Sequence, residues 1–203
     1  MSFETWAGFV AATLVMLAIP GPTILLVIGQ SLGAGRRHAL PLVAGVALGD
    51  LTAMSLSLAG LGAVMAASAL LFTAFKWAGA AYLVWLGVKL WRAPVTAGAL
   101  PPVSGRRAMR DAYVVTALNP KSIAFFVAFV PQFIDGAAPF APQALVLVAT
   151  FVTLAACNAL AYALLAGRLS GAVTRPGVRC VFNRLGGGAL IGAGVATAAM
   201  RRA

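Results

Sequence analysis

The stretch LAIPGPTILL, residues 17–26, places two prolines around a glycine in the middle of an apolar segment. A second stretch, VTALNPKSIAFF at residues 115–126, places one proline after an asparagine in a similar setting. Proline is favoured at the first position of a helix, directly after the residue that caps its amino terminus. Pro22 and Pro120 therefore each predict a helix segment that begins partway along an apolar run. We expect the first and fourth membrane helices to be broken.

A helix that begins inside a membrane leaves its first backbone N–H groups without helical partners and places its positive dipole end there. Such interrupted backbone is tolerated only where it is buried in protein or lines a cavity. Paired broken helices are also a sequence indication of a transporter's binding site. We therefore take Gly21, Pro22 and Thr23 at the first break, and Asn119 and Pro120 at the second, as candidate substrate-binding residues.

The composition indicates an integral membrane protein that consists of one transmembrane domain. Of the 203 residues, 62% are hydrophobic and 9% are charged, and the mean hydropathy is +0.97. A soluble domain would have about 25% charged residues. We expect an all-α fold with six transmembrane helices, because each span needs roughly 20 mostly apolar residues. The predicted spans are residues 6–31, 40–64, 69–91, 111–132, 143–166 and 185–200. The last is short and rich in glycine, and the number of spans is odd if it does not cross.

The net charge of +11 arises from basic residues in short loops, which argues against a nucleic-acid partner. Loops one, three and five contain most of them, whereas loops two and four contain no Lys or Arg. Since Lys and Arg favour the cytoplasmic side, these three loops are predicted to be cytoplasmic and both termini to lie outside a bacterial inner (plasma) membrane. Arg201 and Arg202 at the carboxy terminus oppose this orientation, but the imbalance between the loops is larger.

Two weakly similar halves flank a linker at about residues 93–108 that is rich in proline, glycine and small residues. FKWAGAAYLVWLGV in the third span resembles FNRLGGGALIGAGV in the sixth, and each half contains one proline break. An odd number of spans per half makes the halves opposite in orientation. We expect two inverted three-helix repeats, at about 1–92 and 109–203. Apolar glycine-rich helices also resemble one another through composition alone.

Asp50 lies well inside the second predicted span. A charged residue at the bilayer centre costs about 2.5–3.5 kcal/mol on insertion scales, so Asp50 should face the protein interior and have a partner. It is a candidate for binding the cationic group of a substrate and for coupling transport to proton movement. The alternative is a fixed ion pair or a hydrogen bond between helices.

Three further polar residues are candidates. Lys121 follows the second break and opposes the dipole of the helix it begins, so local stability does not explain it. We expect it to form a positive pocket for a carboxylate together with the two helix amino termini. It could instead pair with Asp50 or extend toward the cytoplasmic face. Asn119 can cap its helix and also offer an amide to substrate. Asn158, deep in the fifth span, can line the path or hydrogen-bond between helices.

Other classes of protein have less support. His38 is the only histidine, Cys157 and Cys180 are far apart, and no pattern of catalytic residues is present, so we expect no enzyme, cofactor or metal site. Export of a metal cation would need more ligands than the spans offer. A non-transporting assembly protein would fit the glycine motifs but not the charged groups beside helix breaks.

Two GxxxG motifs, at Gly45–Gly49 and Gly188–Gly192, favour close helix packing. They could form contacts within one chain or the interface of a homodimer, and the sequence does not separate the two.

The chain resembles the LysE/RhtB family of amino-acid exporters over nearly its whole length. The matching stretches begin with PGPTILLVIGQSLGAGRRHALPLVAGVALGD at Pro20, and continue with FKWAGAAYLVWLGVKLWR, NPKSIAFFVAFVPQFI and FNRLGGGALIGAGV. The resemblance implies a membrane-embedded exporter that moves a small amino acid or derivative out of the cytoplasm, driven by the proton gradient or the membrane potential. Many relatives have Asn after Pro-Gly-Pro, where this chain has Thr23, so a hydroxyl replaces an amide that could contact substrate.

Overall fold

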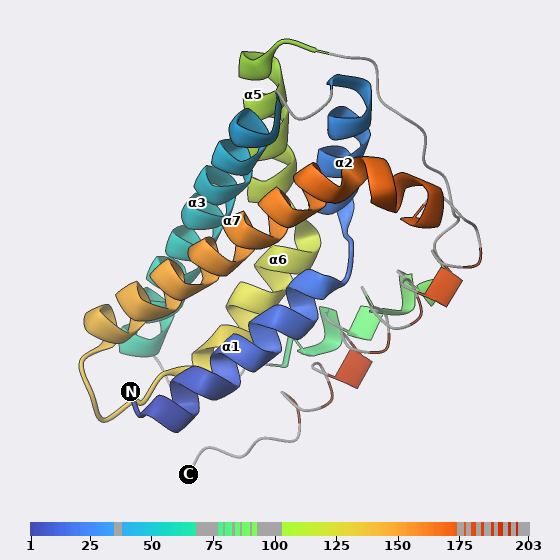
Figure 1. The fold of residues 1–203 in the computed structure, drawn as a ribbon. Coiled ribbons are helices and arrows are strands. Elements are labelled where there is room, and N and C mark those ends of the chain that lie inside the picture. Colours follow the sequence, from blue (N-terminus) through green and yellow to red (C-terminus); the bar gives the residue numbers. More distant parts are fainter. Residues whose placement is uncertain are drawn as a thin grey trace.

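The computed structural model is all-helical in the part of the chain that it describes (Figure 1). It describes residues 1–34, 38–67 and 103–173, together with isolated residues between 77 and 92 and between 177 and 198. The main helices are α1 (Phe3–Ala18), α2 (Pro22–Ala34), α3 (Ala39–Ala67), α5 (Gly105–Ala117), α6 (Pro120–Ala124) and α7 (Phe140–Val173). Directly after α6 come a π-helix, η2 (Phe125–Phe129), and a 3₁₀ helix, η3 (Val130–Phe133).

Within the described ranges, 3 stretches are long and apolar enough to cross a membrane, namely Ala39–Gly60, Gly105–Phe133 and Phe140–Ala166. The bent pair of α1 and α2 provides a fourth if it counts as one span. These stretches agree with four of the predicted spans. The predicted spans at 69–91 and 185–200 lie largely outside the described residues. The six-helix count and the inverted repeat therefore stay predictions.

The first break interrupts the chain between α1 and α2. Helix α1 ends at Ala18, and Ile19 has extended backbone with φ −85° and ψ 112°. Helix α2 begins at Pro22, and its first hydrogen bond runs from the N–H of Leu25 to the carbonyl of Gly21 at 3.0 Å. The two segments are bent by 54° relative to one another. The predicted break with proline at the first helical position is confirmed.

The second break is shorter and preserves the direction of the chain. Asn119 has extended backbone, and its side-chain oxygen accepts a hydrogen bond from the N–H of Lys121 at 3.1 Å, so the predicted cap is confirmed. The N–H of Asn119 still donates to the carbonyl of Thr116 at 3.0 Å. Because this bond bridges the end of α5, the bend here does not exceed 40°, unlike the bend at the first break.

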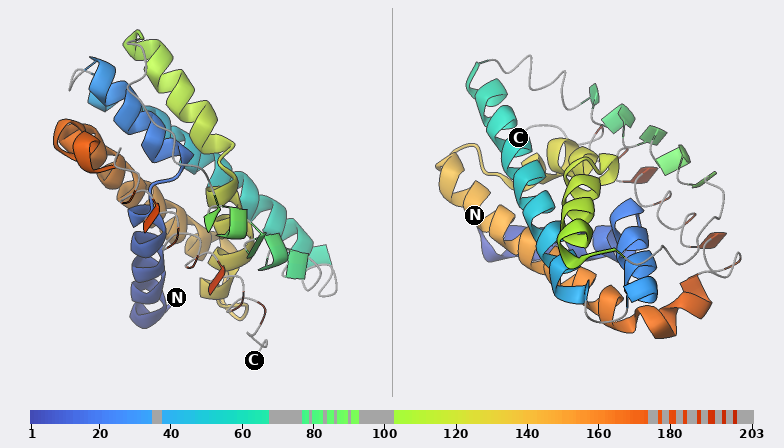
Figure 2. Two further views of the ribbon diagram at one scale, coloured as in Figure 1. Left: turned by 90° about the vertical axis from the view of Figure 1, so that its right-hand side faces the viewer. Right: turned by 90° about the horizontal axis from the view of Figure 1, so that it is seen from above.

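Helices α3 and α5 pack side by side because two glycines remove the side chains between them (Figure 2). A Cβ atom added at Gly45 would collide with the main-chain oxygen of Met109. One added at Gly49 would lie 2.7 Å from the Cβ of Thr116. The first GxxxG motif is therefore an internal helix contact, which was one of the two alternatives. A homodimer stays a prediction.

A cluster of phenylalanines fills the core beyond the second break. Phe125 and Phe126 in the π-helix pack against Phe9 of α1 and Phe151 of α7. The rings of Phe126 and Phe151 meet edge to face with centroids 4.8 Å apart. A π-helix within a membrane span is uncommon and often accompanies a functional site. Here it continues the helix that starts at the second break.

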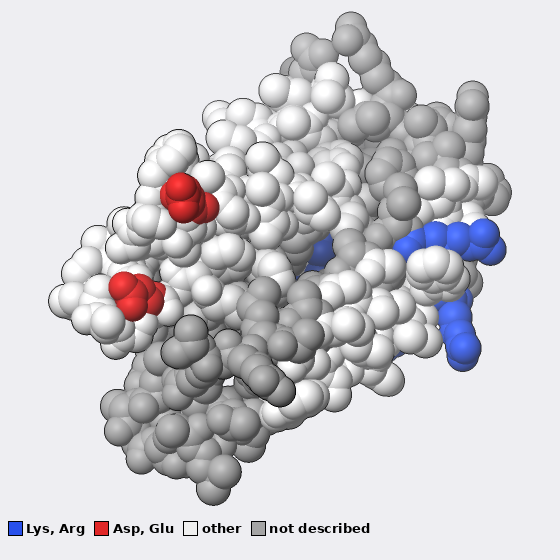
Figure 3. All heavy atoms as spheres, turned by 90° about the horizontal axis from the view of Figure 1, so that it is seen from below, with Lys and Arg blue, Asp and Glu red and all other residues white. Residues whose placement is uncertain are grey.

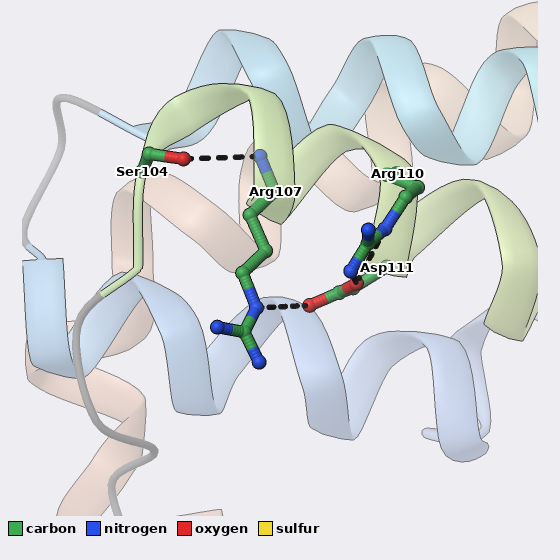
Figure 4. A network of polar contacts seen from close by, with 4 residues as sticks. All are labelled: Ser104, Arg107, Arg110 and Asp111. Carbon is green, nitrogen blue, oxygen red and sulfur yellow. Dashed lines mark hydrogen bonds and ion pairs between the residues drawn. The ribbon is translucent and has the colours of Figure 1, made fainter.

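A group of charged side chains lies in α5, toward one end of the molecule. The end of α2 and the starts of α3 and α5 lie together at the top of Figure 1, far from the amino terminus. At the start of α5, the hydroxyl of Ser104 caps the helix through the N–H of Arg107, and Asp111 pairs with Arg107 and Arg110 at 3.8 and 3.1 Å (Figure 4). Among the described residues seen from below in Figure 3, acidic side chains lie toward one edge and basic ones toward the opposite edge, and a further basic group lies in a hollow between them. Charged side chains at opposite edges are typical of a protein surrounded by lipid.

Candidate functional site

A small cavity lies where the two breaks meet. Its volume is about 30 Å³. Six of the eight candidate residues line it: Gly21, Thr23, Asp50, Asn119, Lys121 and Asn158. Pro22 and Pro120 start the two helices beside it and are not part of its lining. The structure therefore brings together polar residues from α2, α3, α6 and α7, although they are far apart in the sequence.

The two breaks are bonded to one another through Thr23. Its hydroxyl oxygen accepts a hydrogen bond from the side-chain nitrogen of Asn119 at 3.1 Å and from the hydroxyl of Thr116 at 3.3 Å. The oxygen of the Asn119 amide caps α6 at the same time. One of the two N–H donors of this amide and its oxygen are thus engaged by protein, so Asn119 links the two breaks, and its contact with substrate stays a prediction.

The carboxy-terminal end of α1 is held by side chains from other helices. The last four carbonyls of a helix have no partner within it. The Lys121 Nζ donates to the carbonyls of Met16 and Ile19, both at 2.7 Å. On α7, the amide of Asn158 donates to the carbonyl of Leu17 at 3.3 Å, and the hydroxyl of Tyr162 donates to that of Ala18 at 3.1 Å.

Lys121 lines the cavity beside the two breaks, but it forms no ion pair with Asp50 and does not extend to the surface, and its part in binding a carboxylate stays a prediction. The ion pairs in the described part of the chain both involve Asp111, so none joins Lys121 to Asp50. The side chain is 7% exposed and does not reach the surface. It opposes the positive end of α6 but reaches the negative end of α1, and that contact offsets the conflict with its own helix.

Asp50 is buried beside this arrangement, with a relative exposure of 3%. Helix α3 can bring it against the cavity because Gly49 allows close approach to α5. Its Oδ1 atom has no hydrogen-bond partner among the described residues, although the sequence predicts a partner for it. Asp50 also lines the cavity, and a buried carboxylate oxygen without a protein partner retains the capacity to accept a hydrogen bond.

Two residues at the site were not among the sequence candidates. Ser122 lines the cavity and follows Lys121 directly. Tyr162 lies one helical turn after Asn158, and residues at this spacing share a helix face. The spacing of Asn158 and Tyr162 in the sequence was therefore the one sign that both side chains could reach the same neighbouring helix.

Side chains that commonly bind metal ions do not form a group among the residues that the structure describes. Among the residues whose positions are described, no set of three or more His, Cys, Asp or Glu side chains could hold a metal ion.

Apolar spanning helices, a broken span and a buried polar cavity between helices are typical of a polytopic membrane protein. The chain belongs to the LysE type translocator family, whose model matches residues 14–201. The resemblance inferred from the sequence motifs is thereby confirmed.

Several relatives of the chain are named as efflux proteins. The chain is 33% identical over 209 residues to a homoserine/homoserine lactone efflux protein of Salmonella typhimurium, with 100% of each chain covered. It is 31% identical to a leucine efflux protein of Salmonella choleraesuis, covering 80% of this chain and 78% of the relative. An uncharacterized membrane protein of Vibrio cholerae serotype O1 is 38% identical, covering 96% and 97%. No solved structure matches the chain.

Proposed function

We propose that this translocator exports a small amino acid or amino-acid derivative from the cytoplasm and binds it in the cavity between the two breaks. The observation that supports this most is the convergence of six candidate residues from four helices on one cavity. The names of the efflux relatives support the same class of substrate. The expected membrane is the bacterial inner membrane, with the basic loops in the cytoplasm.

The cavity offers groups of both signs, as a zwitterion requires. The Asp50 carboxylate and the carbonyls at the end of α1 are acceptors for an ammonium group. The N–H groups in the first turn of α2 lack helical partners and sit at the positive end of its dipole, where a carboxylate binds well. We propose that the substrate spans these two sets of groups.

The names of the relatives also indicate which chemical group of the substrate determines binding. Homoserine and its lactone, both named for the Salmonella typhimurium protein, share a primary amino group. The carboxyl group of the lactone is closed into an ester, so a free carboxylate is not common to the two. For this chain we therefore propose that the ammonium group is the main determinant of binding and that the carboxylate contributes less.

The conformation described is closed around the site. A cavity of about 30 Å³ has room for about one water molecule and is too small for an amino acid. We propose that the substrate enters when the two halves of the protein rock apart, as in other transporters built around broken helices. Asp50 would exchange a proton between the two sides and so couple efflux to proton entry.

The decisive experiment is transport by the purified protein in proteoliposomes. Vesicles are preloaded with radiolabelled homoserine, homoserine lactone, threonine or leucine, and efflux is followed with and without an imposed pH gradient. We expect at least one of these compounds to leave faster than from protein-free liposomes, and the gradient to accelerate it. Efflux no faster than from protein-free liposomes for all four would contradict the proposal. A parallel assay with divalent cations tests the alternative of metal export.

A further inference from the structure

We infer that the carboxy-terminal end of α1 is the binding site for the substrate's ammonium group, and that the ammonium group of Lys121 occupies this site in the closed structure. The inference rests on the function proposed above and identifies the chemical group that the cavity selects. It also gives Lys121 a role as an internal occupant that the substrate replaces.

The contacts of Lys121 are those an ammonium ligand would make. Its Nζ lies 2.7 Å from the carbonyl oxygens of both Met16 and Ile19, which is the short distance of a charge-assisted hydrogen bond. These carbonyls lie at the negative end of the α1 dipole. Lys121 belongs to α6, so its ammonium group is not part of the helix whose end it binds. It reaches the end of α1 only through its flexible side chain.

The two acceptor carbonyls do not depend on Lys121 for their position. The carbonyls of Leu17 and Ala18, which lie between them in the sequence, are bonded to Asn158 and Tyr162 of α7. Trp6 of α1 also donates to the hydroxyl of Thr150 on α7 at 3.1 Å. Helix α1 is thus fixed to α7 along its length, and the site would persist after the lysine leaves.

A second position for the lysine exists in the same cavity. The Oδ1 atom of Asp50 is buried and has no described partner. Gly21 borders the path, since a Cβ added there would lie 3.5 Å from Lys121 Cδ and 3.8 Å from its Nζ. When a substrate ammonium takes the carbonyls, the Lys121 ammonium can move to the Asp50 carboxylate. One cation then replaces another, and no buried charge is left without a partner.

The exchange has a chemical consequence that can be tested without transport. The site should accept a primary alkylammonium ion, which donates N–H bonds to both carbonyls. It should reject a quaternary ammonium ion, which has the charge but no N–H group. In the native protein the tethered lysine competes at an effective concentration on the order of millimolar, so free alkylammonium should bind weakly.

The test measures the melting temperature of the purified full-length protein in detergent. Lys121→Ala empties the site, and we expect it to melt below the native protein and to gain a few degrees with ethylammonium chloride, in a saturable manner. Tetramethylammonium chloride at equal ionic strength should have no such effect. Lys121→Met keeps most of the side-chain volume and provides a second variant if Lys121→Ala does not fold. We expect homoserine lactone to bind Lys121→Met at least about tenfold more tightly than it binds the native protein, since competition is removed.

The results separate this inference from the proposed function. Absence of stabilisation of Lys121→Ala by ethylammonium, or equal stabilisation by tetramethylammonium, overturns the ammonium site. Unchanged or weaker binding of the lactone to Lys121→Met also overturns it. If ethylammonium stabilises Lys121→Ala but the native protein moves no amino acid, the site stands and the proposed function fails. If the native protein transports an amino acid but ethylammonium does not stabilise Lys121→Ala, the proposed function stands and the ammonium site is overturned.

Discussion

The side-chain nitrogen of Asn119 lies 3.1 Å from the hydroxyl oxygen of Thr23, so the residue that caps the second break is bonded to the first turn after the first break. The same Asn119 amide accepts from the N–H of Lys121 through its oxygen. One buried side chain thus holds two interrupted segments that are distant in sequence. The position of the Asn119 side chain therefore determines which groups the Lys121 side chain can reach.

Thr23→Val should weaken this junction. Valine has nearly the shape of threonine but removes the acceptor, which leaves the buried Asn119 nitrogen without its partner. We expect a loss of about 1–3 kcal/mol in the free energy of unfolding, together with slower transport. Unfolding of the purified protein by heat or denaturant measures the first effect. Thr23→Ser retains the hydroxyl and should stay close to the native protein; equal losses in both variants would contradict the proposed bond.

Gly49→Ala should separate α3 from α5. The new Cβ would lie 2.7 Å from the Cβ of Thr116 and 2.9 Å from the main-chain oxygen of Tyr113, and neither can move without shifting α5. Overpacking of this kind costs about 1–3 kcal/mol, and here it would also displace the neighbouring Asp50. We expect lower thermal stability and a large loss of transport.

Gly60→Ala on the same helix is the matched control for this change. A Cβ added at Gly60 meets nothing within 4 Å. Since alanine favours helix more than glycine does, stability should be unchanged or slightly higher. A native-like Gly49→Ala protein would show that the contact between α3 and α5 is looser than described.

The proposed orientation predicts which loops a membrane-impermeant thiol reagent can reach. In a background with Cys157→Ala and Cys180→Ala, Gly136→Cys should be labelled in intact cells, because the exposed segment after η3 is expected to face outward. Arg106→Cys, at the exposed start of α5, should be labelled only after the inner membrane is permeabilised. Labelling in the opposite pattern would invert the topology and reverse the expected direction of transport.

Proline chemistry made the breaks predictable from the sequence. Proline cannot continue the hydrogen bonds of a helix, and a small or capping residue before it indicates where the next helix begins. Pro22 and Pro120 therefore identified both starting points. Asp50 was recognisable as interior because lipid excludes a carboxylate. These inferences depend on local rules and need no knowledge of how the helices pack.

The partners of Lys121 were not predictable in the same way. Its acceptors are the backbone carbonyls of Met16 and Ile19, and no side-chain pattern marks a backbone carbonyl as free. Those carbonyls are available because α1 ends at Ala18, and they are within reach because the first break bends the chain by 54°. The bend follows from three non-helical residues in sequence, but its size depends on tertiary packing.

Asp50→Asn should separate substrate exchange from proton coupling. Asparagine has nearly the same shape but cannot release a proton, so a pH gradient should no longer drive net efflux. Exchange of labelled for unlabelled substrate should slow but not stop, because the carbonyls at the end of α1 remain while the charged acceptor for the displaced Lys121 is lost. Because asparagine introduces two N–H donors at a buried position, thermal stability is measured on the same preparation as a control for folding. Asp111→Asn, which alters a carboxylate in the middle of α5 that does not line the cavity, is the matched control and should retain gradient-driven efflux. Proteoliposome assays of efflux and of exchange, made on both variants at several imposed gradients, distinguish these outcomes. Full gradient-driven efflux by Asp50→Asn would remove Asp50 from the coupling mechanism, whereas complete loss of exchange would show that the Asp50 carboxylate is required either to bind the substrate or to receive Lys121.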